Sequence, residues 1–233
     1  MSDASTSLHE ALARVVLAGR ELPDVLDEVV RIARGAIPGA EATSVTLIRG
    51  DRSFTAAFDG QLAMDADELQ YERGYGPCMD AARAGETFLV EDMTIDDRWP
   101  DYARHAAERG VRSSLSTPLP FQGATIGALN NYSTRVGGFT PADAALAEEV
   151  AAFVAVVVGN AEAASRAMED AANMRRAMAT RAVIEQAKGI LMERHKITGD
   201  QAFTVLTHAS QRRNVKLRDV ADELVATGEL RAG

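Results

Sequence analysis

The stretch Arg181-Ala-Val-Ile-Glu-Gln-Ala-Lys-Gly-Ile-Leu-Met192 predicts a helix that carries a lysine and a glycine in its middle, where helix formation requires neither. On a helical wheel the apolar residues gather on one broad face that can pack on a core: Val183, Ile184, Ala187, Ile190 and Leu191. A second strip holds Ala182, Gln186 and Gly189, with Arg181 and Lys188 together on its flank. Gly189 costs about 1 kcal/mol relative to alanine. Either another molecule's backbone approaches closely there, or a solvated helix face simply tolerates one glycine.

The residues from Thr180 to Met192 form a long spaced pattern, Thr-Arg-x-x-Ile-x-Gln-Ala-Lys-Gly-Ile-Leu-Met. It continues through Ala202, Phe203, Leu206, Ala209, Leu217 and the run 219–221. This pattern resembles the ANTAR domain, the RNA-binding output module of transcription antitermination regulators. The resemblance implies a dimer that binds paired hairpins in nascent RNA, whose formation prevents a terminator from folding.

The charges of the C-terminal part favour the same function. Residues 172–233 hold 11 Lys+Arg and 7 Asp+Glu, whereas residues 1–171 hold 14 and 27, and the chain has a net charge of −9. A basic tail attracts a phosphate backbone, and an acidic body repels it. RNA loops are read by cations on phosphates, by amides on base edges and by close backbone approach. We therefore predict the following RNA-binding residues: Arg181, Gln186, Lys188, Gly189, Arg212, Arg213, Lys216 and Arg218.

Residues 174–233 are expected to form a three-helix bundle, an ANTAR-like RNA-binding domain. Thr198 and Gln201 fit a capping box at the start of the second helix, Asn214 can end it, and the third helix stops at Gly228. Apolar residues share a face in each of these two helices: Ala202, Val205, Leu206 and Ala209, then Leu217, Val220, Ala221 and Leu224. We expect the bundle's one aromatic residue, Phe203, in the core, and therefore no aromatic platform for base stacking.

A long helix is predicted to precede this bundle. Thr140, Pro141 and Asp143 give a strong helix start, and no proline or other strong break follows until about Lys196, which implies a helix of about 80 Å. Apolar and small residues recur at steps of three and four: Val150, Phe153, Val157, Ala161, Ala164, Met168 and Ala171. This seam predicts a parallel coiled-coil homodimer over the linker 141–173. The alternative is that 150–158 pack on their own domain and the rest is an isolated linker.

Residues 1–140 read as an α+β domain, an antiparallel sheet flanked by helices. Helical spacing indicates helices over 8–18 and 21–34, and a further helix over 100–109. The remaining pattern predicts a hairpin of strands over 45–48 and 53–58, turning at Arg49-Gly50-Asp51, and strands over 87–90, 113–118 and 124–132. A short helix is expected after Gly76-Pro77.

Four motifs in this domain resemble the GAF domains that precede ANTAR modules: Gly76-Pro77-Cys78, Asp97-Arg98-Trp99-Pro100, Gly110-Val111-Arg112-Ser113 and Ile126-Gly127-Ala128-Leu129-Asn130. GAF folds often bind a small molecule between the sheet and a covering loop. The resemblance makes Cys78, Met79, Trp99 and Tyr132 candidate pocket residues. Alternatively, Trp99 and Met79 fill the core, and Cys78 is buried and inert rather than a redox sensor.

Other activities of GAF-like folds find no support. Cys78 lacks the following histidine of bilin attachment, one cysteine is too few for sulfoxide-reductase chemistry, and the Asn-Lys-Phe-Asp-Glu pattern of cyclic-nucleotide binders is absent. The histidines are too scattered to predict a metal site, and no phosphate-binding glycine loop occurs. We predict a protein that is not an enzyme and requires no cofactor.

The single cysteine argues for a reducing compartment, and no stretch resembles a signal peptide or a membrane span, so a cytoplasmic protein is expected. We therefore predict a signal-responsive RNA-binding regulator. A small molecule or a redox event would act on the GAF-like domain and bias the coiled coil. One alternative is a DNA-binding factor with 217–225 as its recognition helix, although that segment is acidic. Another is a scaffold protein that docks a partner helix.

Overall fold

The computed structural model describes residues 3–15, 19–50 and 52–230. The helix predicted over 8–18 ends at Ala13 in the structure, and residues 16–18 and the turn residue Asp51 lie outside the described residues. The chain divides between Glu162 and Ala163 into two compact units, the N-terminal unit and the C-terminal unit. Helix α6 (Pro141–His195) contributes residues to both. Over the described residues, no helix combines the length and the apolarity that a membrane span requires.

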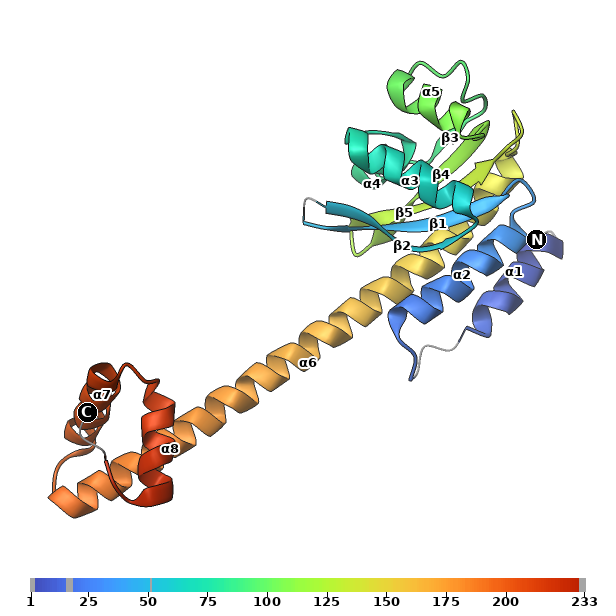
Figure 1. The fold of residues 1–233 in the computed structure, drawn as a ribbon. Helices are drawn as coiled ribbons and strands as arrows, with labels where there is room; N and C mark the ends of the chain where they lie inside the picture. The colour runs from blue at the N-terminus through green and yellow to red at the C-terminus, as the bar shows by residue number, and fades with distance from the viewer. Residues whose placement is uncertain (1–2, 16–18, 51, 231–233) are drawn as a thin grey trace. The chain divides into compact units, whose positions relative to one another are not determined.

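The N-terminal unit is built on a five-stranded antiparallel sheet in the order β2-β1-β5-β4-β3 (Figure 1). Its strands are β1 (Ala42–Arg49), β2 (Arg52–Asp59), β3 (Phe88–Val90), β4 (Ser113–Phe121) and β5 (Ala124–Ser133). Its helices, besides the start of α6, are α1 (Asp3–Ala13), α2 (Leu22–Ala36), α3 (Gln61–Arg73), α4 (Pro77–Ala84) and α5 (Pro100–Glu108). The predicted α+β architecture is confirmed. Helix α3 was not predicted from the sequence.

The two faces of the sheet differ in chemistry because side chains alternate along each strand. One face packs against α1, α2 and the start of α6 through an apolar core that includes Val45 and Leu47 of β1. The other face lies under α3, α4 and α5 (Figure 1) and presents Ser44 and Thr46 instead. The interior beneath these helices is therefore partly polar, unlike the apolar core on the other face of the sheet.

The first part of α6 belongs to the core of the N-terminal unit. Val150, Val154, Val157 and Val158 are buried in the apolar cluster with the sheet. The predicted coiled-coil seam therefore begins with residues that are buried within their own protomer. For 150–158 this agrees with the alternative interpretation, in which these residues pack on their own domain. Farther along, Ala164 and Met168 are exposed. The coiled coil thus stays a prediction for the second half of the linker only.

The C-terminal unit packs the end of α6 against α7 (Gly199–Arg213) and α8 (Leu217–Thr227). Thr198 and Gln201 form the predicted capping box, and Asn214 and Gly228 end their helices in the left-handed conformation, with φ of 52° and 72°. The core consists of Ala187, Leu191, Ala202, Leu206, Ala209, Val220, Ala221 and Leu224. Two expectations were wrong: Val205 and Phe203 point out of this core, with 38% and 44% of their surfaces exposed.

Candidate functional sites

A hollow lined by α6 and α8 contains two of the three residues of the strip predicted around Gly189. Gln186 and Gly189 are both exposed, and with Ile190, Glu193, Arg194 and Val225 they line a hollow of about 900 Å³. A Cβ built on Gly189 would meet no atom of the described residues within 4 Å. The packing of the free protein therefore gives no reason for a glycine at this position.

The predicted cations of α6 lie on its other flank, toward α7. Lys188 Nζ donates to both carboxylate oxygens of Glu185 at 2.9 Å, and only 19% of the lysine side chain is exposed. Arg181 is exposed and makes no hydrogen bond or ion pair with any described residue. It lines a second hollow, of about 450 Å³, together with Phe203. The four RNA-binding residues predicted on α6 thus lie on two flanks of this helix. Gln186 and Gly189 lie on one flank, and Arg181 and Lys188 lie on the other.

The remaining predicted RNA-binding cations differ in their surroundings. Arg213 Nη2 donates to Glu223 Oε2 at 2.6 Å, and only 20% and 21% of these side chains are exposed, so this pair joins α7 to α8. Arg218 lies 3.4 Å from Asp222 in an exposed ion pair. Arg212 and Lys216 are exposed and make no such contact within the described part of the chain. Arg213 is therefore committed to the fold, whereas Arg212 and Lys216 are available to a ligand.

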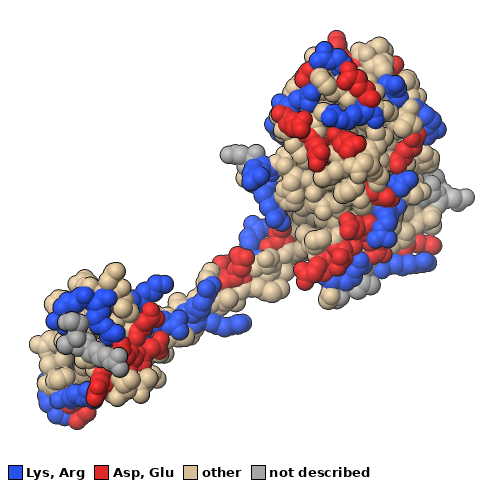
Figure 2. Space-filling model, viewed as in Figure 1, with Lys and Arg blue, Asp and Glu red and all other residues tan. Residues whose placement is uncertain are grey.

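The surface charge of the C-terminal unit is mixed. Figure 2 shows lysine and arginine side chains beside acidic ones on the visible face of this unit. Phosphate contacts would therefore come from individual exposed cations.

In the N-terminal unit the four predicted pocket residues are mostly core. Cys78 is fully buried in a small cluster with Ala81, Ala82 and Ala128, and Tyr132 is buried with the residues around Trp99. Trp99 Nε1 donates to Asp80 Oδ2 at 2.7 Å. Met79 is half-buried. Burial raises the pKa of the Cys78 thiol to about 12, so the thiol stays protonated at neutral pH and its surroundings give no support to a redox role.

The polar face of the sheet is organised around Asp67, a buried carboxyl group on α3. Its oxygens accept hydrogen bonds from Tyr132 Oη at 2.6 Å, Thr55 Oγ1 at 2.8 Å and Asn130 Nδ2 at 3.3 Å. Burial raises the pKa of Asp67 to about 6, and these hydrogen bonds partly offset the effect. Sequence reasoning missed this residue because it missed α3. The sequence signal was an acid set among Ala63, Ala66 and Leu69.

We expect Asp67 to make the stability of the N-terminal unit decrease between about pH 4 and pH 6. An acid whose pKa is raised by folding binds its proton more tightly in the folded state, so its contribution is greatest below the unfolded pKa and is lost as pH rises through the folded value. A shift from 3.8 to about 6 corresponds to about 3 kcal/mol. Urea unfolding across this range should show the decrease, and Asp67→Asn should flatten it. An unchanged pH profile in the variant would contradict this assignment.

Several polar atoms near Asp67 lack partners. Ser114 Oγ, Ser116 Oγ and Asn130 Oδ1 are buried without a hydrogen bond among the described residues. Ser116 pairs with Asn130 across β4 and β5, and Ser114 pairs with Tyr132, so all of them occupy one patch of the polar face. Buried polar atoms without partners are costly, and such groups are usually satisfied by water or by a ligand.

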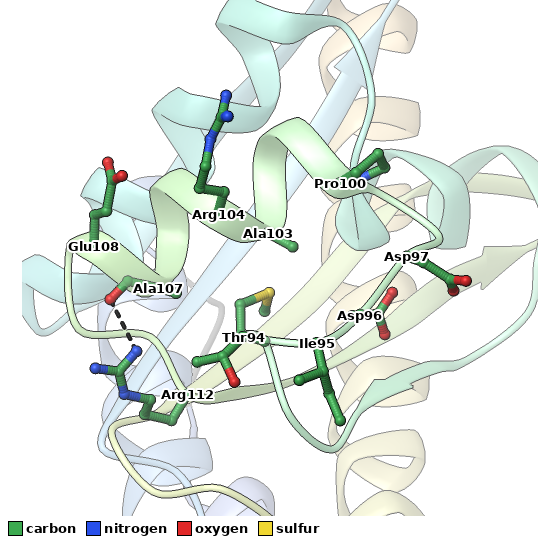
Figure 3. Close-up of a pocket in the computed structure, with 11 residues that line it drawn as sticks. Thr94, Ile95, Asp96, Asp97, Pro100, Ala103, Arg104, Ala107, Glu108 and Arg112 are labelled. Carbon is green, nitrogen blue, oxygen red and sulfur yellow. Dashed lines mark hydrogen bonds between the residues drawn. The ribbon is translucent and has the colours of Figure 1, made fainter.

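A separate hollow of about 500 Å³ lies on the outside of the unit, between the β3–α5 loop and α5 (Figure 3). Arg112 Nη1 closes one side by donating to the carbonyl of Ala107 at 3.1 Å. Asp96, which also lines the hollow, forms an ion pair with Arg98. None of the four predicted pocket residues lines this hollow, whereas the polar interior holds buried polar atoms without partners among the described residues, so the interior is the better candidate for a sensing site.

Comparisons with known proteins agree with both units. A GAF domain model matches residues 19–158, and an ANTAR domain model matches residues 172–225. A search of curated proteins gave no match.

Solved structures share the fold of the N-terminal unit. The GAF domain of a Coxiella burnetii phosphoenolpyruvate-protein phosphotransferase is 20% identical with a TM-score of 0.57, over 71% of this chain and 99% of that one. The corresponding Acinetobacter domain is 19% identical with a TM-score of 0.56, over 70% and 97%. Free methionine-R-sulfoxide reductase from Neisseria meningitidis, solved with its substrate, is 22% identical with a TM-score of 0.54, over 70% and 95%. At these identities the likeness establishes the fold alone.

The two units thus define a regulatory protein, a sensor domain followed by an RNA-binding output domain. The chain belongs to the GAF domain family and carries a C-terminal ANTAR domain, the combination found in GAF-ANTAR transcription antitermination regulators.

Proposed function

We propose that this protein binds hairpins in nascent RNA and promotes transcription antitermination in response to a signal. The observation that carries the proposal is Gly189. It is exposed in a hollow of the ANTAR domain, and no neighbouring atom of the described residues requires it to be a glycine. Since glycine destabilises a helix interior by about 1 kcal/mol, its presence is best explained by a partner that lies directly on the helix.

The exposed polar and charged side chains of the ANTAR domain suit RNA. Gln186, in the same hollow, offers an amide that can bond to the edges of unpaired bases. Arg181, Arg212 and Lys216 are exposed cations available for phosphates. Lys188 can join them only by exchanging its contact with Glu185 for one with RNA.

Homodimerisation through α6 is part of the proposal. Beyond the N-terminal core, α6 exposes Met168, Met174 and Met178, and three large apolar side chains on one solvated helix favour pairing with a second helix. A dimer would present two ANTAR domains to two hairpins. We place this dimer in the cytoplasm, where nascent transcripts are made.

The proposed signal is a small polar molecule that reaches the interior beside Asp67. Ser114, Ser116 and Asn130 supply unpartnered atoms that such a ligand could satisfy. Trp99 lies in the same half of the unit and is the chain's only tryptophan, so its fluorescence should report occupancy. For the signal to regulate RNA binding, it must bind the two states of the protein with different affinity.

Sequencing the RNA that copurifies with the full chain tests the function. We expect enrichment of hairpins upstream of terminators. Binding of a recovered hairpin should weaken with salt, and Arg181→Ala should lower the slope of log K against log salt by about 1 while the dimer stays intact. Arg52→Ala, an exposed arginine of the N-terminal unit, is the matched control and should leave the slope unchanged.

Other outcomes favour the alternatives. Enrichment of duplex DNA instead of RNA would make the protein a DNA-binding factor. Recovery of neither nucleic acid, with a partner protein bound, would make it a scaffold.

A further inference from the structure

The hollow between α6 and α7 offers a further site, whose role rests on the proposed RNA-binding function. Phe203, on α7, is the only Phe, Tyr or Trp between residues 163 and 233. Its side chain leaves the core and is 44% exposed. Its neighbours in the hollow are Arg176, Ala177, Thr180, Arg181, Ile184 and Glu185 of α6. An aromatic ring thus lies within a site that also has apolar walls and two arginines.

The charges of the hollow favour an anionic ligand. Arg176 donates to the neutral amide oxygen of Asn173 at 2.6 Å and therefore keeps its full positive charge. Arg181 has no partner among the described residues. The one acid of the hollow, Glu185, is compensated, because both of its oxygens bind Lys188. The hollow therefore has an excess of positive charge beside an exposed ring.

We propose that Phe203 is a stacking platform for an unpaired base of the bound RNA, with Arg176 and Arg181 on the adjoining phosphates. A ring beside guanidinium groups is the combination that proteins use to hold splayed-out bases. The volume of about 450 Å³ falls in the range of small-molecule sites, about 300–1,000 Å³. This site gives the ANTAR domain a base contact on the flank of α6 opposite to Gly189.

A second copy of the chain fits the hollow less well. A twofold-symmetric contact would place the same surface against itself. Arg176 and Arg181 of one protomer would then face the same two residues of its partner, and like charges in contact are unfavourable. RNA matches both the ring and the charge.

The test begins with a pool of RNA hairpins with randomised loops, from which the full-length protein selects its ligand. Phe203→Leu keeps an apolar side chain but removes the ring. We expect it to bind the selected hairpin about 5- to 150-fold more weakly, since stacking on an aromatic ring contributes that much per base. Phe203→Trp should stay within about threefold of wild type. The matched control is Val205→Ala, because Val205 is exposed on the same helix but does not line the hollow.

A spectroscopic measurement separates stacking from general loss of affinity. 2-Aminopurine is placed at each loop position of the selected hairpin in turn. At one position the wild-type protein should quench its emission, and saturating Phe203→Leu should not.

Each outcome decides something different. Equal affinity and equal quenching in Phe203→Leu would overturn the stacking site but leave RNA binding standing. Loss of self-association in Phe203→Leu would assign the ring to a second copy and also overturn it. Selection of no hairpin by the wild type would overturn the proposed function, and the stacking site with it.

Discussion

Replacing Gly189 with alanine is expected to stabilise the C-terminal unit and to weaken RNA binding at the same time. The free energy of unfolding should rise by about 1 kcal/mol, because alanine is the better helix former and its methyl group meets no atom within 4 Å. Where RNA rests on the helix, the same methyl group overpacks the contact at a cost of about 1–3 kcal/mol, or about 5- to 150-fold in affinity. Amide hydrogen exchange over 181–192 measures the stability, and titration with the selected hairpin measures the affinity.

Gly35 provides the matched control for this prediction. It is an exposed glycine near the end of α2, and a Cβ there would likewise meet no atom within 4 Å. Gly35→Ala should leave hairpin affinity unchanged. If Gly189→Ala binds the hairpin as tightly as wild type, RNA does not approach α6 at this position.

The second large effect is expected at Arg213, which the sequence assigned to RNA and the structure assigns to the fold. Arg213→Ala removes a charge-assisted hydrogen bond between two largely covered side chains, which should cost about 2 kcal/mol. The neighbouring Arg212→Ala removes an exposed cation, so its effect on stability should stay within about 0.5 kcal/mol. Instead, it should lower the salt slope of RNA binding by about 1. Hydrogen exchange and salt titration distinguish the two variants.

Removing both partners of the pair gives a further check. Arg213→Ala combined with Glu223→Ala should lose less stability than the sum of the two single variants, because the two side chains contact each other. A stable Arg213→Ala variant with a reduced salt slope would instead show that the original sequence prediction for this residue was right.

Local signals in the sequence were sufficient for much of the fold. The spacing of apolar residues located α2 and the three C-terminal helices, and Thr198 marked the start of α7 through its capping box. Alternation along 45–48 and 124–132 located two central strands. These signals depend only on residues close to one another in the chain, so a single sequence is enough to detect them.

What the sequence could not provide depends on distant partners. Helix α3 went unpredicted because its buried face includes Asp67 and Gln70, which become favourable only beside the polar face of the sheet. Arg213 looked like any other cation until Glu223 lay beside it. Phe203 was expected in the core because it is apolar, but neighbouring helix positions fill that core. Likewise, the first residues of the predicted coiled coil, within 150–158, pack on the sheet of their own protomer.

RNA binding by the ANTAR domain is tested most directly by crosslinking the selected hairpin to the full chain with ultraviolet light and identifying the attached residues by mass spectrometry. We expect crosslinks on α6 around Gly189 and on α7 at Phe203. Crosslinks confined to the N-terminal unit would contradict RNA binding by the ANTAR domain.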